Sequence, residues 1–311
     1  MVIIYIFAAV FSIELIHRIS IPNTVNNALY PMEIFNTITA VKKSLELYRN
    51  QGKSIGLVPT MGALHEGHLS LIRKCINDNS ITVVSIFINP TQFNDPDDYK
   101  RYPRDLDLDL KILKQYSCDV VFVPSVDEMY PEKDTRIFNF GSLDKHMEGK
   151  YRPDHFNGVA LVVTKLFEII NPHKAYFGEK DFQQLAIIKD LTKKLDLPVT
   201  IIGCPVIREK DGLAMSSRNS LLSPEERKSA TIIFSTLNKI KSQTGKMSVN
   251  GVKNYVRDTI NKDPLLEIEY FEIVDAYELK PIKKWTENIP SVGCIAVHVG
   301  QVRLIDNIKF S

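Results

Sequence analysis

Cysteine is scarce in this sequence, and its four cysteines show no pairing pattern. Cys75, Cys118, Cys204 and Cys294 are scattered along 311 residues, and no two of them have C-x-x-C spacing. The spacing therefore argues against a disulfide framework and against a cysteine-based zinc site. A reduced, cytoplasmic setting is expected.

A surplus of charge of either sign is also missing. The chain has 39 basic and 37 acidic side chains, and its formal net charge is +2. Proteins that bind nucleic acid usually carry a clear basic surplus that contacts phosphates, so no nucleic-acid partner is expected. With 44% apolar and 24% charged residues, the composition is that of a globular protein, and the length allows two domains.

No apolar run in the sequence has the length of a membrane-spanning helix. Residues 1–13 are almost wholly apolar, but Glu14 and Arg18 interrupt the pattern, and a spanning helix needs ~20 apolar residues. The segment also lacks the basic start and the clear cleavage site of a signal peptide, although an anchor or export signal stays an alternative. We favour translation from Met32, which would leave residues 1–31 as an untranslated or disordered extension and would involve no membrane.

From Met32 onward, strand patterns alternate with helical patterns, an order that is typical of right-handed βαβ units on a parallel sheet. We therefore predict a Rossmann-like α/β domain over residues 32–207, with helices on both faces of the sheet. Ligands of such sheets bind at the carboxyl ends of the strands. The expected strands begin near Glu33 and then cover 55–60, 81–88, 119–123, 175–177 and 199–202, and the expected helices cover 38–51, 68–77, 105–116, 157–170 and 181–196.

After about residue 208 the pattern changes. Ser223 followed by Pro224 and two glutamates is a typical helix start, so a helix is expected over 223–242. A second helix is expected over 248–261, and two strands follow at 268–277 and 293–305. We predict that residues 208–311 form a smaller α+β domain, which could act as a lid.

The most informative stretch is 55–72, where an apolar strand, a loop with two glycines and a helix start follow one another. The first N–H groups of a helix lack internal partners and attract anions. His65 and His68 lie at this helix start and could add donors to a phosphate chain. A core histidine beside a surface histidine is the ordinary alternative, and a metal site is less favoured because His65-Glu-Gly-His68 is one residue shorter than H-E-x-x-H.

Two more polar segments follow predicted strands. Gln92 lies in Asn-Pro-Thr-Gln-Phe directly after strand 81–88, where an amide could bind hydroxyl or carboxylate groups, although Asn-Pro alone indicates a turn. Lys180 lies near a helix start, against the usual charge preference there, which favours a role in phosphate binding. Asp181 could simply cap that helix, and Gln184 lies one turn further on.

A fourth polar segment, residues 211–219, lies at the predicted domain junction. Ser216, Ser217 and Arg218 stand there among small residues, as expected for a mobile loop that closes over phosphates and excludes water. An ordinary polar linker is the alternative. The three other polar segments at strand ends favour a ligand-binding loop.

Taken together, these segments resemble the pantothenate synthetase (pantoate–β-alanine ligase) family. The resemblance covers roughly residues 32–309. The motifs that carry it are PTMGALHEGH at 59–68, FINPTQF at 87–93, HFNGV at 155–159, FGEKDFQQ at 177–184, GLAMSSRN at 212–219 and RLIDN at 303–307.

The resemblance implies a nucleotidyltransferase-like enzyme of the H-x-G-H superfamily, usually a homodimer. Its reaction would condense pantoate with β-alanine to pantothenate through a pantoyl adenylate, with release of pyrophosphate and AMP. ATP would act with Mg²⁺ as co-substrate, and no tightly bound organic cofactor is implied. None of Asp105, Asp107 and Asp109 matches a family metal ligand, so the ion would be held mainly by ATP and water.

The resemblance also implies roles for individual residues. His68 would be a proton donor, and His65 and His68 would stabilise negative charge on the phosphates, which Lys180 and Arg218 would also contact. Gln92 and Gln184 would bind pantoate, with Gln92 also near β-alanine. The residues implied for ATP binding are Met61, Gly62, Ala63, Leu64, His65, Glu66, Gly67, His68, Gly178, Glu179, Lys180, Asp181, Ile207, Met215, Ser216, Ser217 and Arg218.

Two other classes of function stay open. A nucleotidyltransferase of the same superfamily would leave the nucleotide on its product, and phosphate-binding motifs alone do not distinguish it from a ligase. A non-catalytic nucleotide-binding protein on the same fold is less favoured, because His65, His68, Lys180 and Arg218 are all present. A tRNA-charging enzyme is disfavoured by the lack of a basic surplus and of room for an anticodon domain.

Overall fold

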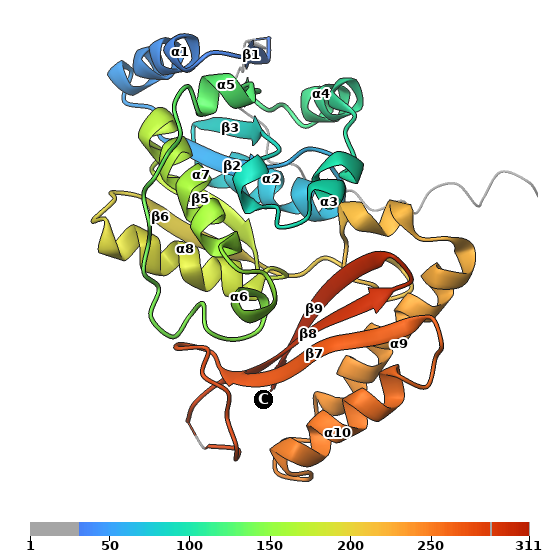
Figure 1. The fold of residues 1–311 in the computed structure, drawn as a ribbon. Helices are drawn as coiled ribbons and strands as arrows, with labels where there is room; N and C mark the ends of the chain where they lie inside the picture. The colour runs from blue at the N-terminus through green and yellow to red at the C-terminus, as the bar shows by residue number, and fades with distance from the viewer. Residues whose placement is uncertain (1–30, 287, 311) are drawn as a thin grey trace, which may run out of the picture. The chain divides into compact units, whose positions relative to one another are not determined.

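The structure is a computed structural model that describes residues 31–286 and 288–310. Two sheets organise this part of the chain (Figure 1). The predictions for the extension 1–31 fall almost entirely outside the described residues. Within them, no helix combines the length and the apolar character needed to cross a membrane.

Six parallel strands form the first sheet, which confirms the predicted architecture. Their order is β1-β4-β3-β2-β5-β6. The strand order reverses between β2 and β5, and such a reversal opens a crevice at the carboxyl ends of the strands. The strands are β1 Glu33–Phe35, β2 Ile55–Thr60, β3 Ile81–Ile86, β4 Val120–Phe122, β5 Lys174–Gly178 and β6 Thr200–Cys204.

Helices cover both faces of this sheet, as predicted. Successive strand residues point to opposite faces, so Leu57 packs in the core with α1, α7 and α8, whereas Val58 packs in the core with α2 and α4. The helices are α1 Ile38–Asn50, α2 Glu66–Asp78, α4 Leu106–Gln115, α7 His155–Ile170 and α8 Phe182–Lys194.

Five short helices are not predicted from the sequence, because a helix of three to six residues has too few turns to show a helical period. They are η1 Pro90–Gln92, α3 Pro96–Arg101, α5 Val126–Met129, α6 Glu148–Tyr151 and η2 Ser217–Leu221. Four of them, η1, α3, α6 and η2, carry residues of the candidate site.

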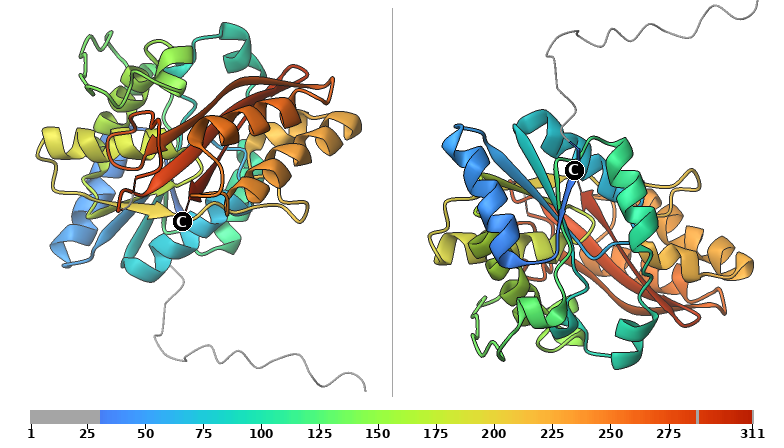
Figure 2. Two further views of the ribbon diagram at one scale, coloured as in Figure 1. Left: turned by 90° about the horizontal axis from the view of Figure 1, so that it is seen from below. Right: turned by 90° about the horizontal axis from the view of Figure 1, so that it is seen from above.

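The second sheet has three antiparallel strands, β7 Leu266–Asp275, β8 Ser291–Val299 and β9 Val302–Phe310, in the order β7-β8-β9. Helices α9 Pro224–Ile240 and α10 Val249–Ile260 cover one face with an apolar core (Figure 2). The other face contacts α6 and α8 through a cluster that includes Met147, Tyr270 and Phe182.

The prediction of one strand over 293–305 is wrong. Gly300 and Gln301 form a two-residue loop, and β8 and β9 pair as a hairpin in which Val299 lies opposite Val302. Gly300 has a φ of +56°, which a glycine adopts without steric cost. The apolar residues of the core change parity across this loop, from Ile295, Val297 and Val299 before it to Val302 and Leu304 after it. The segment 293–305 is rich in apolar residues on both sides of Gly300, and the change of parity marks the turn that the prediction of one strand missed.

The two sheets lie on either side of residue 207 along the chain, where the sequence predicts a domain boundary. Met32–Ser311 nevertheless form one compact unit. The division into a domain over 32–207 and a smaller domain over 208–311 therefore stays a prediction.

Candidate active site

A cleft opens where β2 and β5 end, at the point where the strand order reverses. It has a volume of about 1210 Å³ including its open mouth, which is enough for a ligand of nucleotide size. The structure brings most of the predicted site residues together here. Those that line the cleft are Met61, His65, Gly67, His68, Gln92, Gly178, Lys180, Asp181, Gln184, Ile207, Met215, Ser216, Ser217 and Arg218.

Five predicted ATP-binding residues do not line this cleft. Ala63 and Leu64 border a neighbouring pocket on the outer side of the loop. Glu66 accepts a hydrogen bond from Arg73 at 2.9 Å, and both side chains are about half exposed. Glu179 accepts one from Lys309 at 2.7 Å, and the fifth residue, Gly62, contacts a buried carboxylate behind the loop.

That carboxylate belongs to Asp109, which is only 2% exposed. Its two oxygens accept hydrogen bonds from the backbone N–H groups of Ala63 at 2.9 Å and Leu64 at 2.8 Å. A Cβ on Gly62 would lie 2.8 Å from Asp109 Oδ2, and Gly62 has a φ of +79°. The loop N–H groups that the sequence suggests for phosphate binding are therefore already partly satisfied from within the protein.

His65 and His68 lie at the start of α2, which begins at Glu66, two residues earlier than predicted. His65 is the N-cap residue, and its Nδ1 accepts a hydrogen bond from the N–H of Gly67 at 3.1 Å. His68 Nδ1 accepts a longer one from the N–H of His65 at 3.4 Å. The N–H of Gly67 is therefore capped by a side chain within the protein.

These hydrogen bonds also determine which nitrogen carries the proton. Because Nδ1 is the acceptor in both rings, a neutral imidazole keeps its proton on Nε2. Burial, and then the charge of Lys180, lowers the pKa of His65 to about 4. Burial, and then His65 and Lys180, lower the pKa of His68 to about 3. The ring centroids lie 4.1 Å apart, and both rings are neutral at pH 7.

Lys180 is the cation of the turn between β5 and α8. Its Nζ lies 3.8 Å from a carboxylate oxygen of Asp181, and its side chain is 18% exposed. Asn307 of β9 donates its side-chain N–H groups to the carbonyls of Glu179 and Lys180, both at 2.9 Å. Asp181 occupies the N-cap position of α8, but its side chain makes no capping hydrogen bond. The capping alternative therefore explains the position of Asp181 and gives its carboxylate no partner in the helix.

Arg218 comes from η2, which lies against the glycine loop. The Ser216 hydroxyl caps η2 by accepting from the N–H of Arg218 at 3.3 Å, and the Ser217 hydroxyl donates to the carbonyl of Ala63 at 3.1 Å. The guanidinium of Arg218 donates to Asp98 at 2.8 Å. The Arg218 side chain of the segment 211–219 therefore lines the cleft, and the closure of this segment over phosphates stays a prediction.

Gln92 is positioned by α7 and by its own turn. Asn89 donates to the side-chain oxygen of Gln92 at 3.1 Å, and the Gln92 amide donates to Met61 Sδ at 3.2 Å. A Cβ on Gly158 of α7 would lie 2.2 Å from the carbonyl oxygen of Thr91. Only glycine allows η1 to approach α7 this closely.

A second cavity adjoins the cleft on the side of the antiparallel sheet. It shares Met61, Gln92, Lys180, Asp181, Gln184 and Arg218 with the cleft, and Glu148, Arg152 and Tyr270 also line it. Both predicted pantoate residues, Gln92 and Gln184, therefore lie where the two spaces meet.

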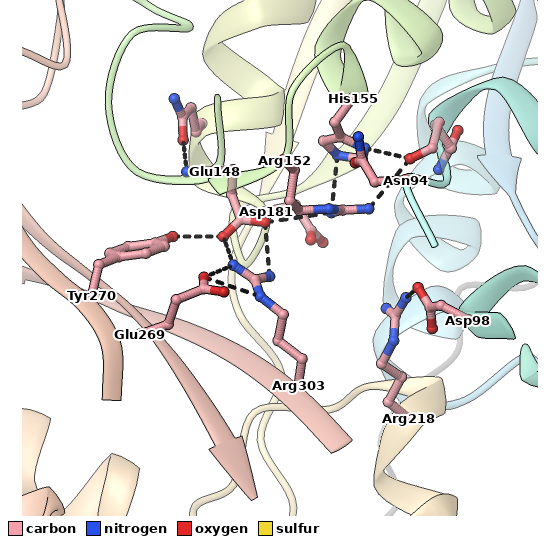
Figure 3. Close-up of polar contacts among 12 residues, drawn as sticks. Asn94, Asp98, Glu148, Arg152, His155, Asp181, Arg218, Glu269, Tyr270 and Arg303 are labelled. Carbon is pink, nitrogen blue, oxygen red and sulfur yellow. Dashed lines mark hydrogen bonds and ion pairs between the residues drawn. The ribbon is translucent and has the colours of Figure 1, made fainter. Parts of the chain in front are cut away.

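Glu148 ties this second cavity to β7 and β9. It accepts hydrogen bonds from Tyr270 at 2.7 Å and from Arg303 at 2.7 and 2.9 Å (Figure 3). Burial alone would raise the pKa of Glu148, but the hydrogen bonds and charge of Arg303 and Arg152 lower it to about 2. His155 joins the same network through Arg152, whose guanidinium lies 3.4 Å from Glu148 and donates to His155 Nε2 at 3.1 Å. The Nδ1 of His155 donates to the carbonyl of Gln92 at 2.8 Å.

Sequence reasoning misses Glu148, Arg152 and Asp98 as parts of the site. Arg303 is included only as a member of a matching motif. Their partners lie up to 155 residues away in the chain, so no local pattern marks these contacts. From the sequence, a charged residue in a short helix is expected to be an ordinary surface residue until its partner is known.

The described residues contain no group of three or more His, Cys, Asp and Glu side chains arranged to hold a metal ion. In the turn that carries Lys180, Asp181 contributes a carboxylate to both spaces, and its side chain is 45% exposed. One carboxylate beside phosphate oxygens and water fits the way Mg²⁺ is usually bound with nucleotides.

The comparisons with known proteins agree with one another. The family model described as pantoate-beta-alanine ligase matches residues 33–309. A pantothenate synthetase from Bacteroides fragilis is 51% identical over 279 residues, which cover 90% of this chain and 99% of the relative. A pantothenate synthetase from Porphyromonas gingivalis is 52% identical, with the same coverage.

Solved structures give the same result. The crystal structure of pantothenate synthetase from Thermus thermophilus has a TM-score of 0.83 and 39% identity, and the match covers 89% of this chain and 99% of that chain. The ligase from Francisella tularensis, complexed with beta-gamma ATP and beta-alanine, has a TM-score of 0.76 and 36% identity. The match covers 89% of this chain and 97% of that chain. All residues that line the cleft lie within the segment that the family model matches.

Proposed function

Because the chain belongs to the pantoate–β-alanine ligase family, we propose that its cleft joins pantoate to β-alanine in an ATP-dependent reaction. The reaction forms pantothenate through a pantoyl adenylate and releases pyrophosphate and AMP. One observation gives the strongest support for assigning this reaction to the cleft. Two cations and two imidazole donors line the same space as the paired amides of Gln92 and Gln184.

In the first step, a carboxylate oxygen of pantoate attacks the α-phosphorus of ATP, and the bond to the pyrophosphate oxygen breaks. Gln92 and Gln184 hold pantoate by its hydroxyl and carboxylate oxygens. Lys180 and Arg218 neutralise charge on the phosphates, while Nε2–H of His65 and of His68 donates hydrogen bonds to them. A carboxylate is a poor nucleophile, so positioning and charge neutralisation contribute more than a strong base would.

The neutral state of the two imidazoles refines the role expected for His68. With a pKa of about 3 in the free protein, His68 is not an imidazolium at neutral pH. We therefore propose that it acts as a hydrogen-bond donor to the leaving oxygen. The cationic charge in the cleft then comes from Lys180 and Arg218.

The nucleotide would lie along the turn 178–181, with Ile207 and Met215 beside its base and Ser216 and Ser217 near its phosphates. Mg²⁺ would accompany ATP and would neutralise charge on its phosphates, and the Asp181 carboxylate, which lines the cleft, would help to hold the ion. The loop residues Gly62, Ala63 and Leu64 would support this site from behind, because their N–H groups are bonded to Thr60 and Asp109.

In the second step, the amine of β-alanine attacks the acyl carbon of the adenylate. A C–N bond forms, the C–O bond to AMP breaks, and the nitrogen loses a proton. The second cavity supports this step, because Gln92 and Gln184 line it as well as the cleft, whereas His65 and His68 line the cleft and not this cavity. We propose that β-alanine enters through it.

Three further assignments belong to the same proposal. Residues 208–311 would act as a lid, since η2 brings Arg218 over the cleft and Asn307 supports the Lys180 turn. The enzyme would work as a homodimer. A cytoplasmic location is supported by the four cysteines, all of which are free and buried.

The test follows the two products separately. Purified protein should release pyrophosphate when ATP and pantoate are supplied, and AMP should appear when β-alanine is added. Pyrophosphate release of equal rate without pantoate would contradict the ligase assignment. If pyrophosphate is released but the nucleotide stays attached to the product after β-alanine is added, the result would favour a nucleotidyltransferase instead.

A further inference from the structure

An ion pair joins the short helix α3 to the loop that carries Arg218. The Arg218 guanidinium donates to Asp98 Oδ2 at 2.8 Å, and 26% of the arginine side chain and 33% of the aspartate side chain are exposed (Figure 3). The two residues are 120 positions apart in the chain. Arg218 also lines both cavities, so the pair stands at their rim.

Neighbouring side chains hold each partner of this ion pair in place. Tyr102, which follows α3, is 7% exposed and lines the cleft, and its ring lies 5.4 Å from the Arg218 guanidinium carbon. The ring of Phe93 packs edge-on against Tyr99 and Tyr102, with centroids 5.3 and 5.7 Å away. On the arginine side, the Ser216 hydroxyl caps η2.

From this geometry we infer that Asp98 is a positioning residue, which orients Arg218 toward the phosphates of ATP. A guanidinium has five N–H donors in one plane. With one nitrogen bonded to Asp98 and the carbon beside the ring of Tyr102, the side chain has few orientations left, and its remaining donors are available to the cleft. Ordering a long side chain before the ligand arrives lowers the entropy lost on binding. The inference rests on the proposed role of Arg218 in phosphate binding.

The ordinary alternative is a surface ion pair without a role in the reaction. Partly exposed pairs contribute little to the stability of a fold, so replacing Asp98 should leave the protein folded under either reading. The two interpretations predict different effects of the substitution on activity. A positioning residue affects catalysis only through Arg218, whereas a general surface charge acts whether or not Arg218 is present.

The experiment compares Asp98→Ala, Asp98→Asn and Asp97→Ala, each in the wild-type and in an Arg218→Gln background. Asp97 is a matched control, because it lies on the same helix, its side chain pairs with Lys100 at 3.4 Å, and it is 72% exposed. Asparagine keeps an oxygen that accepts from the guanidinium, and alanine keeps none. Single-turnover release of pyrophosphate, with enzyme in excess over ATP, measures even strongly impaired variants.

We expect Asp98→Ala to lower kcat/KM for ATP about tenfold, with Asp98→Asn recovering most of the loss and Asp97→Ala changing little. In the Arg218→Gln background, Asp98→Ala should have no further effect. An effect equal to that of Asp97→Ala, or a loss of the same size with and without Arg218, would overturn the inference. Either outcome leaves the proposed function intact, which fails only if the wild-type protein makes no pantothenate.

Discussion

At the scale of single residues, different side chains of the site supply the positive charge and the neutral hydrogen-bond donors. Lys180 and Arg218 carry the positive charge of the cleft, while His65 and His68 are neutral and keep their protons on Nε2. Two imidazolium rings 4.1 Å apart would repel each other, and burial adds to that cost. Most residues that the sequence predicts for the site therefore lie together in one cleft, and the structure changes the role that we propose for the histidines.

Replacing His68 by alanine should leave the fold intact and lower turnover about a hundredfold or more. The reason is the loss of one preorganised donor to an oxygen on which charge develops. Pyrophosphate release with saturating ATP and pantoate gives the rate, and circular dichroism verifies the fold. Unchanged turnover would remove His68 from the mechanism.

The pH dependence of the wild-type enzyme tests the neutral state of both histidines. Because the pKa values of His65 and His68 in the free protein are about 4 and 3, neither ring changes charge between pH 5.5 and 8. We expect kcat/KM for ATP, which reports the free enzyme, to show no inflection from them in this range. An inflection near pH 6.5 that disappears in His68→Ala would contradict this.

Asp109 shows a kind of contact that no sequence pattern marks. Its partners are two backbone N–H groups in a loop 45 and 46 positions earlier, and a backbone donor is the same for every residue type. The resemblance to the family matches none of the alternating residues Asp105, Asp107 and Asp109 with a metal ligand. In the structure, Asp105 caps α4 and Asp109 is buried behind the loop.

Asp109→Asn should raise KM for ATP about tenfold and lower the melting temperature. The amide can accept from one of the two loop N–H groups, but its own NH₂ then faces the other, which loses its acceptor at a cost of about 1–3 kcal/mol. Steady-state kinetics and thermal unfolding measure the two effects. Asp107→Asn is the control, because Asp107 is exposed in the same turn of α4; equal effects of the two substitutions would contradict the role of Asp109.

At the scale of elements, long helices and apolar strands can be predicted, and short helices cannot. The helices that cover the parallel sheet follow the expected ranges within a few residues, because each has several turns. Its strands are short, but they are apolar runs between helices, and they also follow the expected ranges. The hairpin of β8 and β9 is missed, since only Gly300 and a change of parity in the apolar residues mark its loop. The short elements η1 and η2 have no period at all, yet they carry Gln92 and Arg218.

The contact between η1 and α7 gives a test at this scale. In an ordinary helix interior, changing glycine to alanine stabilises the helix by about 0.5–1 kcal/mol. At Gly158 the new Cβ would lie 2.2 Å from the backbone of Thr91, so η1 must move and Gln92 with it. We expect Gly158→Ala to destabilise the protein and to raise KM for pantoate more than KM for ATP.

Denaturant unfolding and steady-state kinetics with each substrate in turn distinguish the outcomes. A more stable Gly158→Ala protein with unchanged kinetics would mean that α7 and η1 are not held at this distance. A lower apparent kcat with both KM values unchanged would point to a general loss of folded protein instead.

At the scale of the whole molecule, buried titratable groups tie stability to pH. His65, His68 and His155 have pKa values of about 4, 3 and 3, each lowered first by burial. In the unfolded chain these rings bind protons at about pH 6.5. Between these values the unfolded state binds more protons than the folded state, so the free energy of unfolding falls as the pH falls.

We therefore expect a continuous loss of unfolding free energy from about pH 6.5 down to pH 4, measured by urea denaturation at each pH. Glu148, whose pKa is lowered to about 2, adds a second loss in more acidic solution. Its stabilising contribution is complete above about pH 4.5 and disappears toward pH 2. His68→Asn should lose less stability than the wild type between pH 6.5 and 4, and equal losses would contradict the assigned pKa of His68.

One contact at this largest scale bears on how the protein is made. Asn307 of β9 donates to the carbonyls of the turn that carries Lys180. A ribosome synthesises that turn early and Asn307 much later, so the growing chain must build its first sheet around an apolar core while the nucleotide site still lacks a support. The turn that carries Lys180 gains its two hydrogen bonds from Asn307 only after β9 has been translated and paired with β8.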